Sequence, residues 1–106
     1  MRNTVHVDVL VPLGGNDGHP FSASAFDQLE AFLLGLTGGF TRRGDVEGTW
    51  KSPEGRVYRD VSRAYALSLP EAEAERIAGS LDAYIREHFA QEAAYLELVP
   101  TRATVF

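Results

Sequence analysis

The stretch from Gly38 to Trp50 constrains the fold most, because it separates two halves that each contain a strand pattern and a helix pattern. It holds four of the ten glycines and the only tryptophan. Glycine ends helices and permits bulges in strands. The stretch is therefore predicted to end a first helix and to begin the central strands of a sheet.

The first half is predicted to form one strand and one helix. From Thr4 to Val11, four valines alternate with other residues, which is typical of a strand buried on one face. After a turn-rich loop at residues 13–20, apolar residues recur at helical spacing. Ser22 or Ser24 is expected to cap this helix, and Gly38 with the following glycine is expected to end it. The buried face of the helix comprises Phe26, Leu29, Leu33 and Leu36.

The middle of the chain is predicted to form an antiparallel hairpin. One strand runs from Phe40 to Trp50, with a bulge around Gly44, and the next runs from Arg56 to Leu69. Between them, the sequence Ser-Pro-Glu-Gly at residues 52–55 favours a tight turn, because proline presets one torsion and glycine relieves the exit.

A second helix and a last strand are predicted to complete the chain. Ser68 and Glu71 fit a capping box, so the helix is expected to open there. Its buried stripe comprises Ile77, Leu81, Ile85 and Phe89. A strand from Ala93 to Val99 follows, closed by Pro100. We expect the tail within residues 99–106 to be loose, or to add an edge strand to this sheet or to a neighbour's.

This order of elements predicts an α+β fold of the ferredoxin-like type, βαββαβ, in one domain at residues 1–106. Right-handed crossovers give a four-stranded antiparallel sheet with both helices on one face. The other face is left uncovered, and it carries apolar residues: Leu10, Tyr65 or Tyr58, and Tyr95 or Leu96, depending on the register. Such a face is commonly covered by a ligand or a second subunit, so we expect a homo-oligomer, either a dimer, which we favour, or a small ring.

Composition excludes several classes of protein. Cysteine is absent, which removes disulfide and thiolate chemistry. The net charge is −5, and acidic residues are interleaved with the basic ones, so we do not expect nucleic-acid binding. No apolar run approaches the roughly 20 residues of a membrane span, and the first residues do not form a signal peptide. We expect a soluble, cytoplasmic protein without a cofactor.

Two segments are the most recognisable motifs of the chain. The first is Gly-Gly-Phe-Thr at residues 38–41 followed by Gly-Thr-Trp at residues 48–50, and the second is Phe-Ala-Gln-Glu at residues 89–92. With these motifs the chain resembles a group of small uncharacterised bacterial ferredoxin-like α+β domains. The resemblance covers nearly the whole chain and implies the fold, but no activity. In topology alone, the chain also looks like the dimeric α/β-barrel and PII-like families.

His6, Asp8 and Glu92 are the candidate catalytic residues. His6 and Asp8 are two apart on a strand, so they share the face opposite the valines. They are either an acid–base pair, two ligands of a metal that needs a third from a helix, or the ordinary polar face of a strand. Glu92 follows the second helix and is a possible general base.

A candidate ligand-binding set lies on the two central strands. Its members supply hydroxyl, cationic and aromatic groups that suit a small anionic ligand, or else they form cross-strand ion pairs and close the core edge. These residues are Thr41, Arg42, Trp50, Arg59, Arg63 and Tyr65.

The sequence favours a homo-oligomeric binding domain, because it contains no convincing catalytic constellation. The open sheet face and the Gly38–Trp50 stretch would form its interface or its pocket. The alternative is a cofactor-independent enzyme in which His6 transfers protons, Asp8 orients it, and Arg59 or Arg63 holds an anionic group. Metal binding through His6, Asp8 and a helix residue is the third interpretation.

Overall fold

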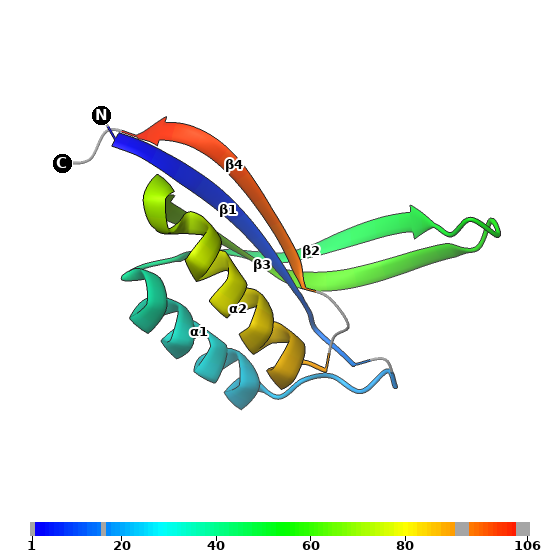
Figure 1. Cartoon of the computed structure of the whole chain (residues 1–106). Helices are drawn as coiled ribbons and strands as arrows, with labels where there is room; N and C mark the ends of the chain where they lie inside the picture. Colours follow the sequence, from blue (N-terminus) through cyan, green and yellow to red (C-terminus); the bar gives the residue numbers. More distant parts are fainter. Residues whose placement is uncertain (1, 16, 91–93, 104–106) are drawn as a thin grey trace.

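A computed structural model describes residues 2–15, 17–90 and 94–103 (Figure 1). The elements occur in the order strand, helix, strand, strand, short 3₁₀ turn, helix, strand. They are β1 (Arg2–Pro12), α1 (Ala23–Thr37), β2 (Thr41–Lys51), β3 (Val57–Pro70), η1 (Glu71–Glu73), α2 (Ala74–His88) and β4 (Tyr95–Ala103).

The strands form one antiparallel sheet in the order β2-β3-β1-β4, and both helices pack on the same face of it (Figure 1). This arrangement confirms the predicted ferredoxin-like fold. The predicted strand bounds are correct to within about one residue for β2 and β3. At β1, the strand extends two residues further towards the N-terminus than the sequence suggested.

The core lies between the sheet and the two helices. The four valines of β1 are buried, with Val7, Val9 and Val11 wholly inaccessible. The predicted helical stripes pack against them, including Leu29 and Leu33 of α1. Alternation on β1 and helical spacing on α1 and α2 therefore identified the buried faces correctly.

Helix α1 begins and ends where the sequence predicted. The side chain of Ser22, and not that of Ser24, caps it by accepting a hydrogen bond of 3.1 Å from the amide of Ala25. Gly38 ends the helix in the left-handed conformation, with φ of 80°, and its N–H donates to the carbonyl of Leu34.

The predicted capping box of the second helix is wrong. Ser68 lies inside β3, where it stands opposite His6, and α2 begins only at Ala74 after the 3₁₀ turn. Among the residues that the structure describes, no side chain caps the start of α2. The ladder to β1 holds the backbone of Ser68 in extended conformation, and it overrides the local helix signal. Neither α1 nor α2 is long and apolar enough to span a membrane, within the described part of the chain.

Strand β4 does not stop at Pro100. It continues to Ala103, and Pro100 itself stands opposite Val5. An edge strand tolerates proline because only one of its sides needs backbone donors. Residues 101–103 thus extend β4 and do not form an additional strand, while residues 104–106 lie outside the described part of the chain.

The hairpin of β2 and β3 projects beyond the helices (Figure 1). Strand β1 ends at Pro12, opposite Ser62, so the sheet has only two strands past that point. We call residues 47–61 the arm. The ladder shifts register between Arg42 and Gly44, where φ of Gly44 is 89°, and this confirms the predicted bulge.

Candidate functional site

The register divides the predicted ligand-binding set between the two faces of the sheet. Residues that stand directly opposite each other on a ladder share a face. Arg42 stands opposite the buried Tyr65, which faces the helices, whereas Thr41 and Trp50 lie on the open face. Arg59 and Arg63 have the parity of Tyr65, as the sequence indicated. These six residues therefore do not line one anion-binding groove.

On the helix face, Glu30 of α1 connects the helix to β2 and β3. Its carboxylate accepts a hydrogen bond of 2.8 Å from the Tyr65 hydroxyl and one of 3.0 Å from Nε of Arg42, with which it also forms an ion pair. The bond from Arg42 is the main cause that lowers the pKa of Glu30, and the Tyr65 hydroxyl adds to it. Burial, followed by the Glu30 carboxylate, raises the pKa of Tyr65. This carboxylate is ionised, and it is bound to both Arg42 and Tyr65.

A second ion pair lies beside the first. Nε of Arg63 donates to Asp45 over 3.1 Å, and its guanidinium also lies 4.4 Å from the centre of the Phe26 ring. The Asp45 carboxylate raises the pKa of Arg63. An open hollow of about 350 Å³ separates α1 from β2 at this point, but its arginines are already paired with carboxylates. The arrangement joins the base of the arm to helix α1.

His6 and Asp8 lie on the open face, opposite the buried valines, as predicted. His6 Nε2 is 2.8 Å from Asp8 Oδ1, and both side chains are partly exposed, at 32% and 43%. Asp8 stands directly opposite Glu97, whose carboxylate accepts a hydrogen bond of 2.7 Å from the Tyr95 hydroxyl. That bond raises the pKa of Tyr95. The open face of β1 and β4 is thus polar and acidic at its centre.

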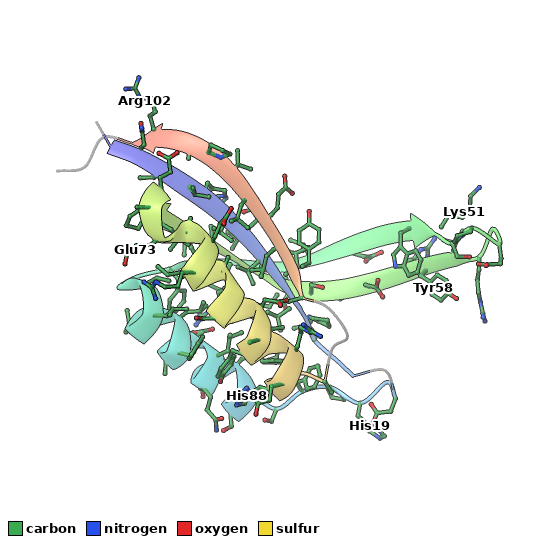
Figure 2. The ribbon with its side chains drawn as sticks, in the orientation of Figure 1. His19, Lys51, Tyr58, Glu73, His88 and Arg102 are labelled. Carbon is green, nitrogen blue, oxygen red and sulfur yellow. The ribbon has the colours of Figure 1, made fainter. Side chains whose placement is uncertain are left out.

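A groove of about 360 Å³ lies on the open face where the arm leaves the sheet. Trp50 and Asp60 form one wall, because the indole N–H donates to Asp60 Oδ2 over 2.8 Å. The indole also stacks on Tyr58, with ring centres 4.5 Å apart. Figure 2 shows Tyr58 and Lys51 on the outer part of the arm, away from the helices. The groove is lined by Leu10, Pro12, Val46, Glu47, Gly48, Trp50, Asp60, Ser62, Ile85, Ala94 and Tyr95.

The sequence indicated parts of this groove but not the groove itself. Trp50 was a candidate ligand-binding residue, and Leu10 was expected on the open face. Of the alternatives left open there, the register selects Tyr58 and Tyr95 and places Leu96 and Tyr65 on the helix face. The partnership of Trp50 with Asp60 was missed, although a tight turn at residues 52–55 nearly fixes it.

The metal site and the catalytic role of Glu92 are the two remaining predictions. Among the described residues, no three histidine or acidic side chains lie where they could share a metal ion. Glu92, the third candidate catalytic residue, lies outside the described residues.

No protein-family model and no curated protein sequence matches the chain. Solved structures do match its fold. CutA1 from Oryza sativa has a TM-score of 0.68 and 14% identity over 98% of this chain and 84% of that chain. CutA1 from Thermus thermophilus, a divalent cation tolerance protein, has a TM-score of 0.68 and 10% identity over 96% of this chain and 87% of that chain. CutA1 from a psychrotrophic Shewanella species has a TM-score of 0.70 and 9% identity over 96% of this chain and 84% of that chain. At these identities the likeness shows the ferredoxin-like fold alone.

Proposed function

We propose that this chain is a cytoplasmic, homo-oligomeric binding domain, in which the arm of one copy packs on the open sheet face of another. The exposed arm is the observation that supports this proposal most strongly. An isolated two-stranded hairpin is marginally stable in water, and this one lies beyond both helices and beyond β1. All eleven residues of β2 are exposed. A second copy would supply the packing that the single chain lacks.

One face of the arm is suited to this contact. Val57 and Val61 are exposed by 58% and 46%, and they share their face with Lys51 and Arg59. Glu47 is the acidic residue at the inner end of this face. An apolar face with cationic side chains at its outer end favours a partner surface that is partly apolar and acidic.

The open face of β1 and β4 has that character. Asp8 and Glu97 stand directly opposite each other, an arrangement of like charges that destabilises a ladder unless a cation lies nearby. Val99, exposed by 42%, stands opposite His6 on this same face and supplies an apolar contact. The charges of the arm and of this surface are therefore complementary, which supports a second copy of the chain as the partner.

Light scattering coupled to size exclusion tests the proposal. We expect the native chain to have a multiple of the chain mass at micromolar concentration. The double variant Val57→Glu, Val61→Glu is expected to dissociate while its circular dichroism stays native-like. Leu34→Glu is the control, because Leu34 is as exposed as Val57 but lies on α1. A monomeric native chain, or dissociation by the control alone, would overturn the proposal.

The hydrogen bond between His6 and Asp8 favours a second candidate, a cofactor-independent acid–base enzyme. Its test is a screen of hydrolase and isomerase substrates with the native chain and the variants His6→Ala and His19→Ala. His19 is a matched control because it also pairs with a carboxylate, that of Asp17, in the exposed loop. Turnover that His6→Ala abolishes and His19→Ala retains would establish the enzyme, and turnover retained by both would exclude His6.

A further inference from the structure

We propose that the groove at the base of the arm binds a small aromatic ammonium ion. The apolar walls and the Trp50 indole would hold the ring of the ligand, and the Asp60 carboxylate would hold its charge. This ligand class differs from the anionic ligand that the sequence suggested.

The first support is the charge of the groove. Asp60 and Glu47 are among the described residues that line it, and none of those residues is basic. Of the two, Asp60 has the parity of the open face, whereas Glu47 stands opposite Val61 and has the parity of the other face. Within the described part of the chain, Asp60 has no cationic side chain within 4.0 Å. Arg59 lines a second hollow, which shares Trp50 and Asp60 with the groove, and it has the opposite parity to Asp60. An anion would be repelled here, and a cation would be attracted.

The second support is the geometry of the Asp60 carboxylate. The indole N–H of Trp50 holds one of its oxygens at 2.8 Å, so its position is fixed beside an aromatic ring. Tyr95 also lines the groove, and Trp50 and Tyr95 are each half exposed at 51%. A fixed carboxylate that shares a groove with two exposed aromatic rings suits an ammonium group, which gains both an ion pair and cation–π contacts.

The third support is Gly48, which stands directly opposite Asp60 on the ladder. Its φ is not in the left-handed region, and a Cβ added there meets no atom within 4 Å. Nothing in the chain itself therefore requires glycine at this position, although glycine weakens a strand interior. Its missing side chain leaves the floor of the groove open beside the carboxylate.

The inference does not depend on assembly, because one chain supplies every lining residue. In the proposed contact between copies, the arm uses its opposite face, where Val57 and Val61 lie. The acceptor surface at Asp8, Glu97 and Val99 shares the open face with the groove, but none of these three residues lines the groove. The two proposals can therefore fail separately. Light scattering reports assembly, and the fluorescence of Trp50, the only tryptophan, reports occupation of the groove.

The test is a fluorescence titration with benzylamine, benzyl alcohol and benzoate, which share one ring and differ in charge. We expect saturable binding of benzylamine, about fivefold tighter than benzyl alcohol, and weaker binding of benzoate. Asp60→Asn is expected to remove the preference for the cation while retaining an acceptor for the indole. Glu54→Gln, at the tip of the same arm, is the control and is expected to retain the preference.

Gly48→Val gives an independent test. Valine favours strands, so we expect this variant to melt at the same or a higher temperature than the native chain. Its side chain would fill the floor of the groove, and benzylamine binding is expected to be lost. Equal affinity for the three probes, tightest binding of benzoate, absence of saturable binding, or unchanged binding by Asp60→Asn or Gly48→Val would overturn the inference.

Discussion

The hydroxyl of Tyr65 donates a hydrogen bond of 2.8 Å to the Glu30 carboxylate, which joins the centre of strand β3 to helix α1. The Tyr65 ring is wholly buried and meets the edge of Phe40 with ring centres 5.7 Å apart. Glu30 also forms an ion pair with Arg42, near the start of strand β2. One carboxylate therefore connects helix α1, the core and the start of strand β2.

The first prediction concerns the hydroxyl of Tyr65. Tyr65→Phe keeps the ring in the core but removes a hydrogen bond to a charged acceptor, so we expect a loss of about 1–2 kcal/mol in the free energy of unfolding. Urea denaturation at a fixed protein concentration measures it. Tyr58→Phe, on the exposed arm, is expected to change the free energy by less than about 0.5 kcal/mol. An equal loss in both variants would contradict this interpretation of the bond.

The second prediction concerns the pH dependence that Glu30 causes. Because Arg42 and Tyr65 lower its pKa in the folded chain, Glu30 stabilises the fold above its unfolded pKa of about 4.3. That stabilisation is lost as the pH falls through the lowered folded value. We therefore expect Glu30→Gln to be less stable than the native chain at neutral pH, and the difference to shrink at acidic pH. Urea denaturation across this range measures it, and a difference independent of pH would refute it.

Periodicity predicted the layers of this fold correctly because each buried face has a sequence period of its own. The valines of β1 alternate, and Ile77, Leu81 and Ile85 of α2 recur every four residues. Such patterns depend only on which face of an element is buried. They can therefore be recognised in the sequence before the packing partners of the element are known.

The side of the sheet on which each β2 residue lies could not be predicted in the same way. The bulge adds one residue between Arg42 and Gly44, so the parity of the strand changes there. Arg42 and Trp50 are both even-numbered, yet Arg42 faces the helices and Trp50 the open side. The sequence indicated a bulge near Gly44, but not which residue was the additional one.

Tertiary pairing also overrode local signals at two places. Ser68 has the sequence context of a helix cap, but the ladder with β1 incorporates it into β3. Pro100 resembles a strand terminator, but it continues β4 opposite Val5, because an edge strand pairs on one side only and tolerates a missing N–H. In both cases the deciding partner lies far away in the sequence.

The third prediction compares two glycines. Gly79 lies in α2, and a Cβ added there meets no atom within 4 Å, so Gly79→Ala is expected to raise the free energy of unfolding by about 0.5–1 kcal/mol. Gly38 ends α1 with φ of 80°, so Gly38→Ala is expected to lower it by about 1–2 kcal/mol. Urea denaturation of both variants should give opposite signs. The same sign in both would show that backbone conformation does not control these sites.

The fourth prediction concerns Phe89, which lies at the end of α2 and is wholly buried. Its ring meets Phe21 edge-on at 4.9 Å and Phe26 at 5.3 Å, measured between ring centres. Removing the ring leaves a cavity where α1, α2 and the first loop meet, so we expect Phe89→Ala to cost about 3–5 kcal/mol. Leu34→Ala, on the exposed side of α1, is expected to cost less than about 0.5 kcal/mol. Thermal and urea unfolding followed by circular dichroism measure both, and a small loss for Phe89→Ala would show that this end of the core repacks around the vacated space.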